Sequence, residues 1–162
     1  MAVQPQADLD LKPLGGEART LQEWLTLFHL VGVVIDPYTY ESSWLLETAG
    51  RVLEGFQAAD CRVAFIVAAD EDDARQFLGP WAEKVLTFVD PDRALIRELE
   101  LETLPALVHI GHNGALEGSA EGWNPAEWRE LAGGLAKILS WTAPIIPATN
   151  DPAPFAGSPA TP

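Results

Sequence analysis

Hydrophobic positions along the chain alternate between the spacing of helices and the unbroken runs of buried strands. The capping box Thr20-Leu-Gln-Glu23, in which a hydroxyl and a carboxylate satisfy free backbone amides, predicts a helix over 20–29. The β-branched run from Val31 to Ile35 predicts a strand buried on both faces, as in parallel sheets. The same reasoning predicts helices over 41–57, 70–79 and 92–101, and strands over 62–68 and 84–89.

The pattern after residue 103 predicts a hairpin followed by a helix. Two apolar runs, 104–110 and 115–120, flank an Asn113-Gly114 pair that readily adopts the positive φ angles of a tight turn. Asn124-Pro125-Ala-Glu127 then combines a helix cap, a proline at the first helical position and a capping glutamate. The whole order predicts an α/β fold with one central mixed sheet, flanked by helices, whose last strand pair is antiparallel.

The two ends of the chain differ from this core in composition. Six of the 13 prolines fall within the last 19 residues, where hydrophobic periodicity stops. We therefore divide the chain into a flexible arm over 1–16, a folded domain over 17–141 and an Ala/Pro-rich tail over 142–162. We expect the tail to be disordered; the alternative is an extended strap that docks on the body or on a partner through Ile145, Ile146 and Phe155.

Composition and charge narrow the choice of partners. Ten Lys and Arg against 24 Asp and Glu give a net charge of −14, which disfavours nucleic acid and anionic membranes and favours a protein partner with a basic surface. No apolar run is long enough to cross a bilayer, and the first residues lack the pattern of a signal peptide. We therefore expect a cytoplasmic protein.

The element order and three local motifs resemble the thioredoxin superfamily. The motifs are Val31-Gly-Val-Val-Ile-Asp36, Thr103-Leu104-Pro105-Ala-Leu-Val and the segment 85–116, which is similar to the branch of TlpA-type thiol–disulfide proteins and peroxiredoxins. The resemblance covers roughly residues 20–140. It implies a thioredoxin-like fold, a cis-proline at Pro105 and a redox loop after the first central strand.

The redox cysteines that this resemblance implies are absent. Aligning Asp36 with the family's strand-end acid places the Cys-x-x-Cys motif at Ser42-Ser-Trp-Leu45. An unassisted serine hydroxyl stays protonated at neutral pH and cannot replace a thiolate. The peroxiredoxin pattern fails in the same way, because Thr39-Tyr-Glu-Ser42 ends in serine. The one cysteine, Cys61, precedes a buried strand, so we interpret it as a small core residue; a one-cysteine redox role is the alternative.

Aromatic residues gather where the family's cysteines would lie, and the family uses this surface to bind extended segments. Large aromatic side chains bury much area at low entropic cost. We therefore predict a binding groove, with ordinary half-buried aromatics as the alternative. The groove is formed by Tyr38, Tyr40, Ser42, Trp44, Leu104 and Pro105.

Other chemistry-bearing residues have structural explanations. His109 and His112 lie on a strand end and a turn, without an evident third ligand, so we expect no metal site. The acidic run Asp70–Asp73 suits the first turn of a helix. Asp36 is expected to hydrogen-bond to backbone or tyrosine groups. We also expect no cofactor, since the chain contains no dinucleotide or phosphate-binding motif.

These observations predict a redox-inactive thioredoxin-like protein that acts by binding, as an adaptor, an assembly factor or an accessory subunit of a complex, and not as an enzyme. Cysteine-free relatives in the family include maturation chaperones. The alternative is a thiol–disulfide oxidoreductase or peroxiredoxin-like enzyme that uses Cys61 with an external thiol. A third hypothesis is a small-ligand carrier that uses the aromatic groove.

Overall fold

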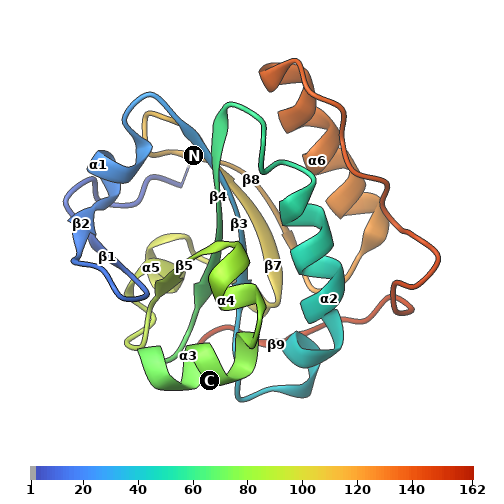
Figure 1. The fold of residues 1–162 in the computed structure, drawn as a ribbon, viewed down its shortest axis with the longest axis horizontal. Helices are drawn as coiled ribbons and strands as arrows, with labels where there is room; N and C mark the ends of the chain where they lie inside the picture. The colour runs from blue at the N-terminus through green and yellow to red at the C-terminus, as the bar shows by residue number, and fades with distance from the viewer. Residues whose placement is uncertain (1–2) are drawn as a thin grey trace.

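A computed structural model describes residues 3–162, and a seven-stranded mixed sheet forms its centre (Figure 1). The strand order is β2-β1-β5-β4-β3-β7-β8. The three middle strands β3, β4 and β5 run parallel, and β7 and β8 continue the sheet antiparallel beside β3. Their bounds are β1 Asp10–Pro13, β2 Arg19–Thr20, β3 His29–Ile35, β4 Cys61–Val67, β5 Leu86–Val89, β7 Ala106–Ile110 and β8 Leu116–Glu121.

Helices cover both faces of the sheet, so the side chains on both faces of the central strands are buried. Along β3, Val31, Val33 and Ile35 pack on the core beneath one group of helices. Leu30 and Val34 point to the opposite core. The first core is covered by α2 (Tyr40–Glu54), α3 (Glu71–Leu78), α4 (Trp81–Lys84) and α6 (Pro125–Leu139), and the second by α1 (Leu21–Leu25) and α5 (Ala94–Glu98). None of the helices over residues 3–162 combines the length and apolarity needed to cross a bilayer.

The first predicted helix is shorter in the structure than in the sequence pattern. The capping box forms, but α1 ends at Leu25, and Leu27 takes a φ of 70° that interrupts the helix. His29, placed in the helix by the pattern, instead begins β3, because its backbone pairs with β4. The spacing of apolar residues does not predict this pairing between strands.

The amino-terminal arm differs from the flexible segment expected over 1–16. Residues 10–13 form β1, which joins β2 to β5. Leu11 is buried, and the Trp24 indole donates a hydrogen bond of 3.2 Å to its carbonyl oxygen. A strand that buries alternate side chains explains why these residues are ordered.

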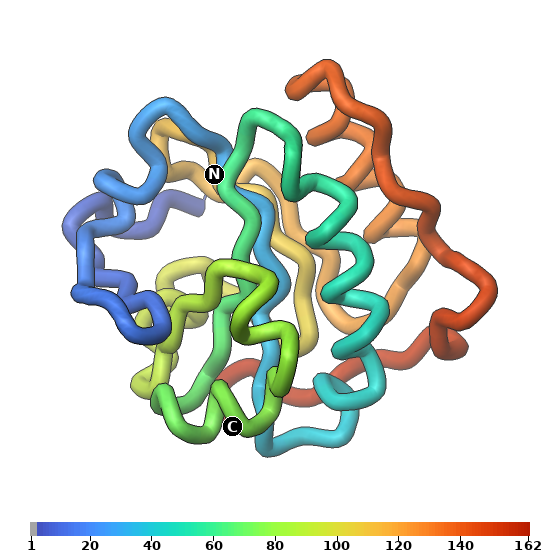
Figure 2. Tube along the Cα trace, viewed as in Figure 1, coloured from blue at the N-terminus to red at the C-terminus, as the bar shows by residue number. Residues whose placement is uncertain are grey.

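The carboxyl-terminal tail also differs from the disordered segment that its composition suggested. Figure 2 shows the chain after α6 returning along that helix and then crossing the end of the sheet. There β9 (Ser158–Pro159) pairs antiparallel with β6 (Thr103–Leu104). Ile146 is buried, Phe155 is half-buried and Ile145 is exposed. Hydrogen bonds to the tail's main chain compensate for its lack of hydrophobic periodicity.

Candidate functional site

The serine that stands at the family's cysteine position has a structural role. Ser42 is fully buried in α2, and its Oγ accepts a hydrogen bond of 2.9 Å from the backbone N–H of Asp36. The Asp36 carboxylate in turn accepts from the Tyr38 N–H and forms an ion pair of 2.7 Å with Arg93. These groups contact one another, so they hold the loop in place.

The predicted aromatic groove is open on one side and occupied on the other. Tyr38, Tyr40 and Trp44 are exposed, with 65%, 77% and 57% of their surfaces accessible. Leu104 is buried, and the Leu104–Pro105 peptide bond is cis. The chain's own tail fills the space between these two parts, with Phe155 edge-on to Trp44 at 5.6 Å between ring centroids.

Cys61 lies at the opposite end of the sheet from Pro105. It pairs with His29 at the start of β3, whereas Ala106 pairs with Val34, five residues further along. Roughly 17 Å of strand separates these positions. The thiol is half-buried, and its Sγ lies 3.7 Å from the Phe56 carbonyl oxygen. Burial, together with the Asp60 carboxylate, raises the pKa of Cys61 to about 11, so the resting thiol is protonated at neutral pH.

The thiol borders a surface pocket of about 260 Å³. Arg62, the next residue, contributes its guanidinium to the lining and stacks over the Phe28 ring at 4.9 Å. Gln57, Val63 and Leu86 complete the wall. Cys61 and Arg62 thus both line this pocket, while the Arg62 Nε donates to the Trp24 carbonyl oxygen.

Histidines lie next to the cysteine. His29 is its register partner on the neighbouring parallel strand, so the two side chains point to the same face about 5 Å apart at the backbone. His29 Nδ1 lies 2.8 Å from His109 Nε2, at hydrogen-bond distance. The His112 ring stands edge-on to His29, with the centroids 5.3 Å apart. The structure therefore gathers all three histidines and the one thiol at one end of the sheet.

The surroundings of His29, which is half-buried, and of His109, which is buried, both favour the neutral imidazole. Burial, with a smaller effect from His29, lowers the pKa of His109 to about 4. Burial and the neighbouring His112 lower the pKa of His29, although Glu117 opposes this shift. In the tautomer in which His29 Nδ1 donates to His109 Nε2, the Nε2 atom of His29 keeps a lone pair. That atom can accept a proton from a nearby thiol.

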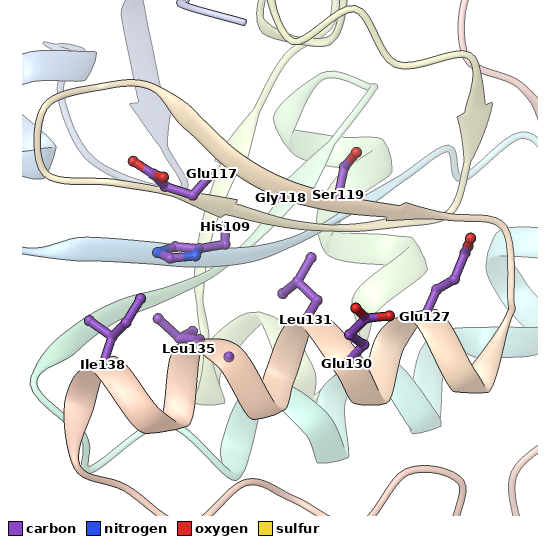
Figure 3. A pocket seen from close by; sticks show the side chains of 10 residues that line it. His109, Glu117, Gly118, Ser119, Glu127, Glu130, Leu131, Leu135 and Ile138 are labelled. Atoms are coloured by element: carbon purple, nitrogen blue, oxygen red, sulfur yellow. The ribbon is translucent and has the colours of Figure 1, made fainter. Parts of the chain in front are cut away.

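His109 also borders a larger pocket of about 470 Å³ between the β7–β8 pair and α6 (Figure 3). Figure 3 shows its ring beside Glu117, with Leu135 and Ile138 of α6 below. Among residues 3–162, no group of three or more His, Cys, Asp or Glu side chains is placed to hold a metal ion.

Sequence reasoning missed the pairing of Cys61 with His29, although a signal for it exists. Each residue stands two positions before the first valine of a buried strand, in His29-Leu-Val31 and Cys61-Arg-Val63. Two parallel strands aligned by their first buried valines would place the two side chains together. Assigning His29 to the preceding helix concealed this spacing.

Comparisons with solved structures establish the fold class. A candidate protein disulfide isomerase from Bacteroides thetaiotaomicron has a TM-score of 0.68 at 14% identity, covering 86% of this chain and 91% of its own. A secreted Mycobacterium tuberculosis disulfide oxidoreductase has a TM-score of 0.61 at 16% identity, and the match covers 81% of this chain and 96% of that protein. Xanthomonas campestris peroxiredoxin Q has a TM-score of 0.63 at 16% identity, and the match covers 83% of this chain and 90% of that protein. The chain thus has a thioredoxin-like fold, with one cysteine and no Cys-x-x-Cys motif.

Sequence comparisons add no closer relative. No protein-family model matches the chain, and no curated protein matches it either.

These neighbours correct the leading functional expectation. A redox-inactive adaptor, assembly factor or accessory subunit was expected because both motif cysteines are absent. The structures that share the fold are disulfide oxidoreductases and a peroxiredoxin, which favours the alternative of thiol chemistry. The expectation failed because it interpreted Cys61 as a small core residue, whereas Cys61 is half-buried and borders a surface pocket at the end of the sheet that holds the histidines.

Proposed function

We propose that this chain catalyses thiol–disulfide exchange through Cys61 together with an external thiol. The observation that carries the proposal is the register of β3 and β4, which places His29 beside Cys61 on the same face of the sheet, with His29 Nδ1 2.8 Å from His109 Nε2. A protonated thiol needs a base at the moment of attack, and a neutral imidazole is the side chain best suited to that task near pH 7. The fold shared with disulfide oxidoreductases supports the same class of reaction.

The exchange proceeds in two balanced steps. In the first, His29 Nε2 takes the proton from Cys61 while the sulfur attacks a disulfide R–S–S–R′, forming Cys61–S–S–R and releasing R′–S⁻. The histidine returns the proton to that leaving thiolate. In the second, an external thiol R–SH attacks the mixed disulfide, which regenerates the Cys61 thiol and forms R–S–S–R. His109 holds the His29 ring by the hydrogen bond between them and stabilises its protonated form.

The pocket beside Cys61 suits a small disulfide that carries carboxylates. Arg62 is its basic lining group, within a chain of net charge −14 that repels anions elsewhere. Attraction to this guanidinium would raise the local concentration of an anionic disulfide at the pocket that Cys61 lines. A reducing compartment such as the cytoplasm would supply the external thiol.

The test is the rate at which native protein forms a mixed disulfide with oxidised glutathione, followed by intact mass. We expect one adduct per chain, none in Cys61→Ser, and slower reaction with the cationic disulfide cystamine. Arg62→Gln should reduce that preference for the anionic disulfide, while Arg75→Gln, an exposed arginine elsewhere, should not. Reaction of Cys61 only after unfolding in denaturant would overturn the proposal.

A further inference from the structure

The cavity of about 470 Å³ between the β7–β8 pair and α6 has a size at which proteins bind small molecules. It is open because glycines stand on its two facing walls. Gly118 is the register partner of His109 on the neighbouring strand, so its missing side chain leaves one side of the imidazole uncovered. On α6, a Cβ atom at Gly134 would meet nothing within 4 Å. Side chains at these two positions would therefore fill the space.

One end of the cavity presents an unpaired polar atom. His109 is 5% exposed, and its Nε2 lies 2.8 Å from His29 Nδ1. Its Nδ1 makes no hydrogen bond within residues 3–162, whereas every fully buried polar side-chain atom of these residues has a partner. Nδ1 is therefore accessible through the cavity that the ring lines, and Figure 3 shows the ring between the strand pair and α6. In the tautomer in which His109 Nε2 accepts from His29, Nδ1 carries a proton and is a donor.

The other end of the cavity is acidic. Glu127 and Glu130 stand three residues apart on α6, so their side chains lie on one face of the helix. Within residues 3–162, neither carboxylate forms an ion pair, and no lysine or arginine lines the cavity. Figure 3 shows these carboxylates at one end and His109 at the other, with Leu131 between them. This end therefore attracts a cation, and the middle of the cavity suits an apolar group.

The His109 end selects for a hydroxyl group. Figure 3 shows the Glu117 carboxylate beside the imidazole, where it would repel an anionic ligand. A hydroxyl suits both neighbours, because it can accept from the Nδ1–H of His109 and donate to Glu117. Leu135, below His109 in the same view, lies five residues after Glu130, so the two ends are roughly 8 Å apart along the helix.

We propose that this cavity binds a small amphipathic amine that carries a hydroxyl group at its far end. The ammonium group pairs with Glu127 and Glu130, the apolar middle packs on Leu131, and the hydroxyl bonds to His109 Nδ1. This cavity shares no lining residue with the pocket beside Cys61. Binding of the amine is therefore measured separately from thiol exchange.

The test titrates the full chain with tyramine by isothermal titration calorimetry. Tyramine carries an ammonium group and a phenolic hydroxyl at opposite ends of one apolar ring, and we expect it to bind at one site per chain. Phenethylamine, which lacks the hydroxyl, should bind about fivefold more weakly, the effect of one lost hydrogen bond. Phloretate, which has a carboxylate in place of the ammonium, should not bind.

Two glycines of α6 provide a matched pair of variants. Gly134→Leu places a side chain in the cavity, whereas Gly133→Leu makes the same change at a neighbour that does not line it. A Cβ atom meets nothing within 4 Å at either position, and leucine favours a helix more than glycine does, so both variants should fold. We expect Gly134→Leu to bind tyramine roughly tenfold more weakly than the wild type. Gly133→Leu should bind it like the wild type.

A second variant tests the charge without filling the cavity. Glu130→Gln keeps the size of the side chain and removes one carboxylate of the pair, so it should weaken tyramine binding about threefold, and less at high salt. Glu83→Gln, at an exposed position of α4, should have no effect. Absence of saturable tyramine binding to the wild type would overturn the proposal. Equal binding to the wild type, Gly134→Leu and Glu130→Gln would also overturn it.

Discussion

The end of the central sheet near Pro105, where the sequence resemblance places the redox loop, differs from the opposite end, where we propose that thiol chemistry occurs. At the end near Pro105, Ser42, Asp36 and Arg93 satisfy one another, and the C-terminal strap, residues 143–162, covers what remains. At the opposite end, Cys61 borders a surface pocket, and His29, its register partner, lies at hydrogen-bond distance from His109. The comparison teaches that a motif position does not by itself locate the chemistry, because a fold can hold reactive groups at either edge of its sheet.

The largest effect expected at the Pro105 end is on stability. Arg93→Ala leaves the Asp36 carboxylate, whose side chain is 4% exposed, without its cationic partner and removes a donor to the strap. Breaking a buried ion pair in this way costs about 3 kcal/mol of unfolding free energy. Denaturant unfolding measures the loss. Arg97→Ala, on the exposed side of α5, should change it by less than about 0.5 kcal/mol. An equally small loss in Arg93→Ala would show that the Arg93–Asp36 ion pair does not stabilise the end of the sheet near Pro105.

A smaller effect is expected from acid at the Cys61 end. Because the pKa of His109 is lowered to about 4, the folded chain keeps this ring neutral while the unfolded chain protonates it below about 6.5. The contribution of His109 is therefore complete above pH 6.5 and is lost as the pH falls towards 4, with roughly 2 kcal/mol lost by pH 5. Comparing thermal unfolding of the wild type and His109→Gln across this window isolates it from the titration of carboxylates. Identical pH dependence in both would contradict the burial of a neutral histidine.

The smallest effect separates the two ends directly. Ser42→Ala removes the acceptor of the Asp36 N–H and should cost about 1 kcal/mol of stability. It should leave the exchange rate at Cys61 unchanged, because the two sites lie at opposite ends of the sheet. A slower exchange in a variant that folds normally would mean that Ser42 takes part in the chemistry.

The sheet could be predicted from the sequence because its central strands are unbroken hydrophobic runs. Val31–Ile35 and the hairpin around Asn113-Gly114 carry their own local signals. The thioredoxin-like order followed from these elements.

The strap and the thiol site could not be predicted, because both depend on contacts between distant segments. The strap is held by Arg51, Arg93 and Trp123, which lie far from it in sequence, and its Pro-rich composition shows no period of its own. The Cys61–His29 pair depends on strand register, and the apolar residues before His29 extend the helical pattern across it. Composition identified the single thiol but not its neighbours.

The most direct measurement of the central claim is the pH dependence of mixed-disulfide formation at Cys61. A thiol with a pKa of about 11 and no base reacts tenfold faster with each pH unit up to that value. We predict this steep profile for His29→Gln. The rate of mixed-disulfide formation by the wild type should stay nearly level between pH 7 and 8 and should be about a hundredfold higher there than that of His29→Gln. The two rates should converge towards pH 11. The control Arg75→Gln, an exposed residue of α3 away from Cys61, should follow the wild type. Coincident profiles for the wild type and His29→Gln would contradict the account.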